Sequence, residues 1–222
     1  MNPLFLYIYN IFSNYITPLT AIFPVYFAFK NYPSLTSPFK ILFAFIVVSS
    51  LFNAANLIAI GLYHVQTVKW IPVYTVLEFS FIALVFSRVY NKKWCKYFYA
   101  LIITFAAVCA YNAIFIQNKV EFNTYTRPVG ALLIIAFCMN YIIKTGTLES
   151  KWTDNNFNWI NIGLLLYYSA GLIMFTFSNY FLKLNTLTLT IWTIHDTILI
   201  TEYILFGIGF YKSGIAYKSV TK

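Results

Sequence analysis

FKILFAFIVVSSLFNAANLIAIGL, residues 39–62, is the stretch that decides the fold of this chain. Its one charge is Lys40, at the second position, and nearly all the remaining residues are apolar. A helix needs about 20 such residues to cross the roughly 30 Å hydrocarbon core of a bilayer, so the stretch predicts a membrane-spanning helix. Six more apolar stretches of similar length occur, near 4–29, 70–90, 97–117, 128–144, 157–180 and 186–211.

The seven stretches predict an all-α polytopic membrane protein, in which residues 1–222 form a single seven-helix transmembrane domain. The composition agrees with this class. Hydrophobic residues make up 60% of the chain and charged residues 9%, whereas a soluble domain carries about 25% charged residues. The connections between the stretches are short, so we expect no folded domain outside the membrane.

The basic residues predict the orientation of the bundle. With seven spans, 11 of the 15 Lys and Arg fall on the side of the C-terminus, and four fall on the other side, namely Lys69, Lys119, Arg127 and Lys183. Cytoplasmic loops are enriched in Lys and Arg, so we expect the N-terminus outside and the C-terminus in the cytoplasm. The net charge of +9 is scattered over short loops, which predicts contacts with membrane lipids and argues against a nucleic-acid partner.

Three acidic residues lie where membrane helices rarely carry them. The chain has six Asp and Glu, of which Glu78, Asp196 and Glu202 fall inside the predicted spans, whereas no Lys or Arg lies deep in a span. A charge at the bilayer centre costs roughly 2.5–3.5 kcal/mol on insertion scales, so such residues are functional candidates. Glu78 lies about 12 Å from the outer end of its helix, and His195 about 14 Å from the outer end of the last helix. We therefore expect these two side chains to meet at one level.

Other polar residues fall near the same level and predict a polar cavity in the outer half of the bundle. Asn53 and Asn56 share one helical face because they are three residues apart, and Trp192 and His195 share another. Asp196 points about 100° away from that second face. The candidates for binding a ligand or a proton are Glu78, His195, Asp196, Asn53, Asn56, Tyr74, Asn112, Trp192 and Glu202, and Tyr111 is a further expected lining residue.

Two interpretations of these polar groups stay open. In the first they hold helices together, as polar side chains commonly do in membranes for about 1 kcal/mol each. In the second, Glu78 and His195 form a proton relay or a pH-sensitive switch, because imidazole titrates near physiological pH.

Glu78, His195 and Asp196 would also suit an intramembrane enzyme that acts on lipids by acid–base chemistry, so the question of catalysis stays open.

Several chemistries are excluded by the residues that the chain lacks. It has two histidines, His64 and His195, too few for a catalytic zinc held by three protein nitrogens. It has no GxSxG, Walker A or HExxH motif. We therefore expect neither a metal nor a cofactor. A third functional alternative, a small-solute or proton-coupled transporter, is weakened because no internal repeat is visible.

Three stretches of the chain carry a family resemblance. They are LYHVQTVKWIPVYTVLEF (62–79), NWINIGLLLYYSAGLIMFTFSNY (158–180) and LTIWTIHDTILITEYILFGIGFYK (189–212). Tyr74, Glu78 and Phe79 form a Tyr-x-x-x-Glu-Phe pattern, and Trp192 and His195 form a Trp-x-x-His pattern. The chain thereby resembles a family of uncharacterised bacterial seven-helix inner-membrane proteins. The resemblance implies a multi-pass protein of the bacterial inner (cytoplasmic) membrane and hints at a signalling partner, but it implies no reaction.

These features favour an integral membrane sensor or receptor-like subunit. A ligand or proton would engage the region of Glu78 and His195 from outside and shift the packing of the two helices that carry them. We expect no output domain in the chain, so the signal would pass to a separate cytoplasmic or membrane partner, such as a sensor kinase.

Overall fold

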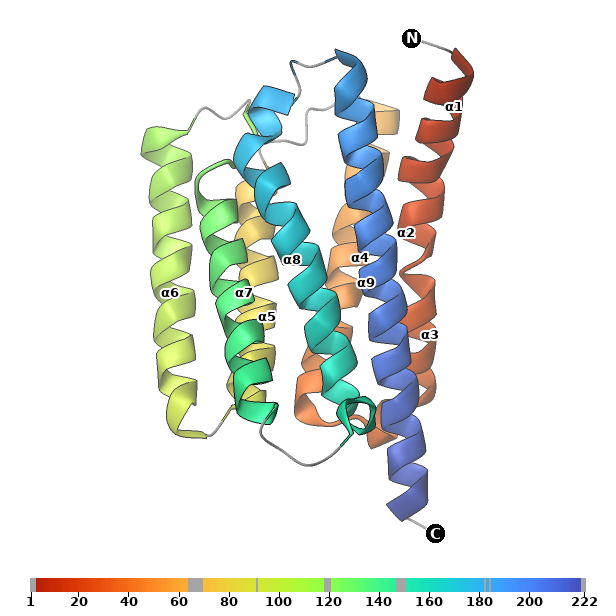
Figure 1. Ribbon diagram of the computed structural model, residues 1–222. Helices are drawn as coiled ribbons and strands as arrows, with labels where there is room; N and C mark the ends of the chain where they lie inside the picture. Colours follow the sequence, from red (N-terminus) through yellow and green to blue (C-terminus); the bar gives the residue numbers. More distant parts are fainter. Residues whose placement is uncertain are drawn as a thin grey trace.

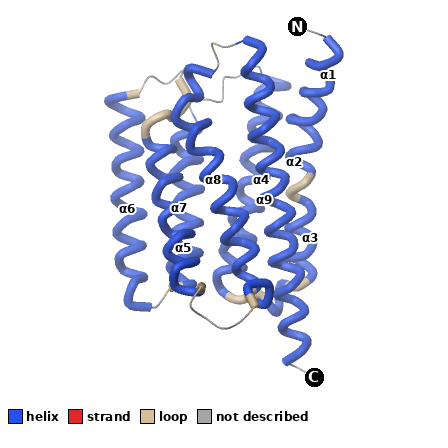
Figure 2. Tube along the Cα trace, in the orientation of Figure 1, coloured by secondary structure: helices blue, strands red, loops and turns tan. Residues whose placement is uncertain are grey.

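A computed structural model describes residues 3–63, 70–90, 92–117, 121–146, 151–181, 183 and 185–220 (Figure 1). These residues form helices joined by turns and short loops, with no strand among them (Figure 2). Within the described ranges, seven helical segments are long and apolar enough to cross a membrane. The prediction of an all-α chain with seven long apolar helices is confirmed, and it indicates a multi-pass membrane protein. His64, Lys69 and Lys119 lie outside the described residues.

The seven segments lie close to their predicted positions. The first, Leu4–Lys30, combines α1 (Pro3–Ile11), a π-helical turn (Phe12–Ile16), α2 (Thr17–Leu19) and α3 (Ile22–Lys30). The others are α4 (Ser37–Tyr63), α5 (Ile71–Val89), α6 (Cys95–Tyr111) with a π-helical turn (Asn112–Ile116), α7 (Thr126–Thr145), α8 (Asn156–Phe181) and α9 (Asn185–Val220). Short 3₁₀ turns occur at Tyr32–Ser34, Lys92–Trp94 and Trp152–Asp154.

The bundle is organised around α8 and α5. α8 packs against α7 and α9, and α9 packs in turn against α3 of the first span. α5 packs against α4, α6 and α7, while α6 lies at the edge of the bundle (Figure 1). Aromatic side chains fill the interior, because Phe79, Phe86, Phe206 and Phe210 are at most 1% exposed.

The two chain termini lie at opposite ends of the bundle, as an odd number of spans requires (Figure 1). We call these the N-terminal end and the C-terminal end. α4 and α8 run toward the N-terminal end, and α5 and α9 run away from it. Residues late in α4 therefore lie level with residues early in α5 and α9.

The first span is interrupted at its middle. Pro18 has no N–H and cannot make the usual helical hydrogen bond. The preceding turn, Phe12–Ile16, is a wider π-helical turn, and Thr17 Oγ1 donates a 3.0 Å hydrogen bond to the Phe12 carbonyl. Such π-helical turns often lie at functional sites. Here the interruption places Thr17 and Pro18 on the wall of a cavity.

Candidate functional site

A cavity of about 310 Å³ lies in the N-terminal half of the bundle, lined by side chains of the first span, α4, α5, α7, α8 and α9. Its volume falls at the lower end of the range for small-molecule sites. Six of the nine candidate residues line it, namely Asn53, Asn56, Tyr74, Trp192, His195 and Asp196.

Helical spacing explains why these side chains converge. Asn53 and Asn56 are three residues apart late in α4, so both face the cavity. Trp192 and His195 have the same spacing in α9, and Asp196 follows about 100° around the same helix. All three residues of α9 reach the cavity, which means that a wide sector of this helix faces it.

His195 and Asp196 leave polar atoms unpartnered in this wall. Neither ring nitrogen of His195 has a hydrogen-bond partner, and neither does Asp196 Oδ2, although these atoms are buried. His195 Nδ1 lies 3.7 Å from Asp196 Oδ1, which is too long for a hydrogen bond. Most buried polar groups in proteins are satisfied, so an unsatisfied cluster of this kind calls for an explanation.

Aromatic rings surround the imidazole. The ring centres of Tyr167, Trp192 and Phe175 lie 5.4, 5.8 and 6.1 Å from that of His195, all in edge-on arrangements. Phe122, from the segment before α7, packs on Trp192 with ring centres 5.9 Å apart. The backbone of Phe122 is held in turn by Asn179, which accepts from its N–H and donates to its carbonyl. The aromatic wall is therefore fixed by contacts from two directions.

Arg127 is the basic residue of this site, and the sequence interpretation missed it. It was counted as a loop residue, but it lies in the first turn of α7, with its side chain 18% exposed. Its Nη2 lies 3.8 Å from Oε2 of Glu78, and its guanidinium lies 4.1 Å from the ring centre of Phe175. The sequence pattern predicts a loop position for Arg127, so its burial in the bundle corrects that expectation. Arg127 also lines the cavity, and its Nε has no hydrogen-bond partner.

A signal for Arg127 was present in the sequence. Residues three, four and seven positions after it, Gly130, Ala131 and Ile134, are all buried on the inner face of α7. The apolar period of this helix could thus have been extended one turn back to Arg127. The turn itself is held by Asn123, whose Oδ1 accepts hydrogen bonds from the backbone N–H and the hydroxyl of Thr126.

Glu78 and Glu202 both line a smaller cavity of about 20 Å³, which adjoins the first one. Tyr74 and Tyr167 line both cavities, so the two cavities share part of their walls. A space of this size suffices for one water molecule. Toward the C-terminal end, Ile46 and Phe206 line the small cavity, and both are 0% exposed.

The expected contact between Glu78 and His195 is not formed. In the described part of the chain, the ion-pair partner of Glu78 is Arg127, and the nearest charged group to His195 is Asp196. The depth estimate was correct, because both side chains lie in the same half of the bundle around adjoining cavities. Depth along a helix did not predict the charged partners of Glu78 and His195, because it does not fix the direction in which a side chain points.

Asn112 and Tyr111 lie away from the cavity, contrary to expectation. Asn112 is buried at the end of α6, where its Nδ2 donates a 3.0 Å hydrogen bond to Oε1 of Gln117. Tyr111 is 59% exposed. Both lie at the end of α6, the helix at the edge of the bundle. Their predicted depth carries no information about which helices surround α6.

Among the described residues, no group of three or more His, Cys, Asp and Glu side chains is placed to hold a metal ion. No protein-family model, no curated protein and no solved structure matches the chain. The resemblance to a bacterial seven-helix family therefore stays a prediction, and the geometry of the site carries the functional argument.

Proposed function

We propose that this protein is an integral membrane sensor or receptor-like subunit that binds a small polar ligand in the cavity of the N-terminal half. The unpartnered polar atoms of His195 and Asp196 carry this proposal. A ligand with a hydrogen-bond donor and an acceptor would satisfy them, and the stabilisation would be large because the groups are already desolvated. The imidazole and the carboxylate offer both kinds of partner.

The orientation belongs to the same proposal. The cavity end faces the outside of a bacterial inner membrane, and the C-terminal end faces the cytoplasm. The asymmetry of basic residues supports this orientation, and the burial of Arg127 strengthens it. Once Arg127 is removed from the loop charges, three Lys remain on the outer side against 11 Lys and Arg on the other.

α9 would carry the signal across the membrane. It is a single helix of 36 residues, about 54 Å long, and it holds His195 and Asp196 near one end. Binding at these residues would shift α9 against α8 and α3, the helices on which it packs. A separate partner, such as a sensor kinase, would detect the shift at the cytoplasmic end.

The closed inner end of the polar region favours a sensor over a transporter. Polar groups continue from the large cavity to Glu202, and fully buried Ile46 and Phe206 then follow. Gly163 of α8 also lies close to Phe206, since a Cβ built there would be 3.0 Å from its ring. A ligand held above this packed layer can move helices without passing through the bundle.

Binding can be tested with purified protein in detergent. Small polar solutes are screened for an increase in thermal stability, first with the unmodified chain and then with Asp196→Asn and His195→Gln. We expect a stabilising solute whose effect is lost in both variants and kept in Asp154→Asn, an exposed acid at the other end. A solute that stabilises all four proteins equally would contradict the proposal.

The sensor part needs a structural measurement. In a cysteine-free background, spin labels at Phe29 in α3 and Ile215 in α9 report the separation of these helices at the C-terminal end; both residues are exposed. We expect the bound solute to change the label distance, and the change to disappear with Asp196→Asn. Binding without any change in this distance would remove the sensor function while leaving the binding site in place.

A further inference from the structure

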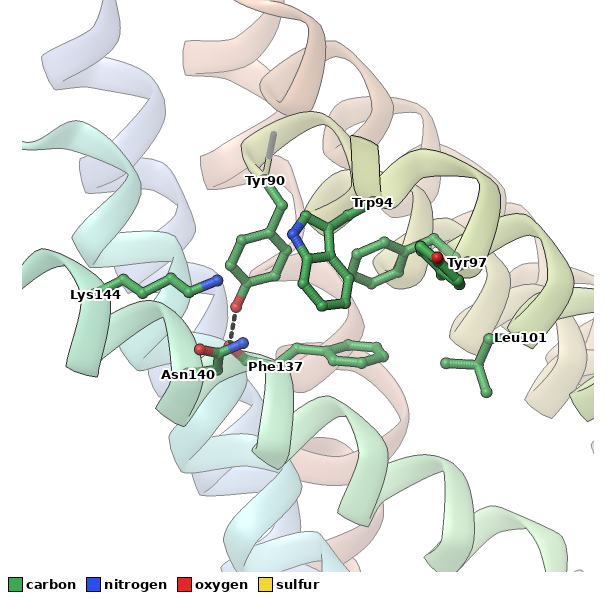
Figure 3. Close-up of a pocket in the computed structure, with 8 residues that line it drawn as sticks. Tyr90, Trp94, Tyr97, Leu101, Phe137, Asn140 and Lys144 are labelled. Atoms are coloured by element: carbon green, nitrogen blue, oxygen red, sulfur yellow. Dashed lines mark hydrogen bonds between the residues drawn. The ribbon is translucent and has the colours of Figure 1, made fainter. Parts of the chain in front are cut away.

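A second pocket, of about 190 Å³, lies at the C-terminal end between α5, α6 and α7 (Figure 3). Aromatic rings dominate its wall, among them those of Tyr90, Phe98 and Phe137. Trp94 and Tyr97 stand at its edge and are 52% and 58% exposed. The pocket is therefore accessible from the outer surface of the bundle, where apolar spans meet the membrane.

A basic residue stands at the rim of this pocket. Nζ of Lys144, in the last turn of α7, lies 4.6 Å from the ring centre of Tyr90 and 5.7 Å from that of Trp94 (Figure 3). Long basic side chains near helix ends extend to the membrane interface. Lys93 and Lys96 are also exposed at the start of α6. Positive charge is thus concentrated where lipid headgroups lie.

The part of the wall formed by Tyr90, Phe98 and Phe137 is held by contacts among these residues. The Tyr90 hydroxyl donates a 2.9 Å hydrogen bond to the Phe137 carbonyl, and the Tyr90 and Phe98 rings stack at 5.8 Å. Partial burial, with smaller contributions from Cys138 and Tyr141, raises the pKa of Tyr90 to about 12. The phenol therefore remains a protonated donor at neutral pH, and the wall keeps its shape before a ligand arrives.

We propose that this pocket binds one anionic phospholipid from the adjacent leaflet. The phosphate lies near the Lys144 ammonium group, and an acyl chain runs along Phe137 and Leu101. Charge complementarity selects the headgroup, and the aromatic and aliphatic wall accommodates the chain. A second copy of the protein is a poor occupant, because a symmetric contact would bring the same lysines together. The site is separate from the polar cavity, so the proposal stands independently of the sensor function.

Native mass spectrometry of the delipidated protein tests this site. The protein is mixed with phosphatidylglycerol or phosphatidylcholine that carry identical acyl chains. We expect one phosphatidylglycerol to be retained preferentially, and Lys144→Gln to reduce that retention about fivefold. The matched control is Lys30→Gln, since Lys30 is also exposed at this end with its Nζ 5.7 Å from a tyrosine ring centre, and it should retain the lipid.

A second variant tests the apolar part without changing the charge. Asn140→Trp places an indole in the pocket, and we expect it to exclude the lipid while thermal unfolding stays cooperative. Equal retention of the two lipids would overturn the proposal. Displacement of the lipid by millimolar inorganic phosphate would reduce the site to an anion site. A dimer mass in place of bound lipid would assign the surface to a second copy.

Discussion

Arg127 and Lys144 stand at the two ends of the same helix, α7, and they use aromatic rings in opposite ways. Arg127 is buried against Phe175 and paired with Glu78. Lys144 is exposed and lies over the rings of Tyr90 and Trp94 from outside.

This difference indicates that charged side chains are buried in the bundle at its N-terminal end and remain exposed at its C-terminal end. At the N-terminal end, buried ionisable side chains, namely Arg127, His195 and Asp196, keep polar atoms without hydrogen-bond partners beside a cavity. At the C-terminal end, the interior is packed with rings and the charges are kept at the rim. Function at the first end would come from unsatisfied groups, and stability at the second from close packing.

The largest effect is expected from breaking the inner ion pair. Arg127→Met leaves Glu78 in place with its ion-pair partner removed, and this should lower the free energy of unfolding by about 3–5 kcal/mol. Arg127→Met combined with Glu78→Gln should recover most of the loss, because no unpaired charge remains. Chemical denaturation in detergent measures both. Lys144→Gln serves as the comparison and should cost less than about 1 kcal/mol.

The packing of the two halves can be compared by adding one carbon to each. A Cβ at Gly209 would lie 2.7 Å from the terminal carbon of fully buried Ile160. Gly209→Ala should therefore cost about 1–2 kcal/mol, after the better helix propensity of Ala is included. Asn56→Gln extends into the cavity and should change stability by less than about 0.5 kcal/mol. Similar losses in both variants would show that the halves are equally packed.

Tyr90→Phe tests the hydrogen bond beside the pocket between α6 and α7. Its loss should cost about 1 kcal/mol at pH 8. Since the pKa of Tyr90 is raised to about 12 from an ordinary 10, its stabilising contribution is complete below pH 10 and declines as the pH rises toward 12. The difference between Tyr90→Phe and the unmodified protein should therefore shrink over this interval. A constant difference in denaturation experiments would contradict the assignment.

Asp196→Asn should have the smallest effect on stability. The substitution keeps the shape of the side chain, and one carboxylate oxygen has no partner to lose. We expect a change of less than about 0.5 kcal/mol in the free energy of unfolding, measured by the same denaturation. A loss greater than that of Tyr90→Phe would mean that Asp196 holds the bundle together, and this would support the packing interpretation of the polar residues.

The fold was predictable because membrane crossing depends on composition and length, and residues 39–62 show both without reference to any other part of the chain. The levels of Glu78 and His195 were predictable for a similar reason, because helical rise is constant. Their partners were not. Whether Glu78 meets Arg127 or His195 depends on helix rotation and neighbour order, which are set by packing between spans.

Arg127 and Asn112 were mispredicted in opposite ways: Arg127 lines the cavity although it was not predicted to, and Asn112 was predicted to line it but does not. Arg127 precedes Pro128 at the start of a span, so composition suggested a loop, whereas the buried face of α7 includes it. Asn112 has the right depth but belongs to α6, and the neighbours of α6 appear only in three dimensions.

The π-helical turn at Phe12–Ile16 accommodates one extra residue in the first span. A π-helical turn holds about one residue more than an α-helical turn. Deleting one residue here would let an ordinary helix form, and the segments before and after the turn would keep nearly the same rotation about the helix axis, because the wide turn itself takes up the extra residue. Deleting a second residue would rotate everything before it by about 100° relative to α3, although no side chain of either segment had been replaced. One- and two-residue deletions at this turn would therefore separate the effect of the wide turn itself from the effect of helix rotation on the cavity wall at Ser13, Thr17 and Pro18.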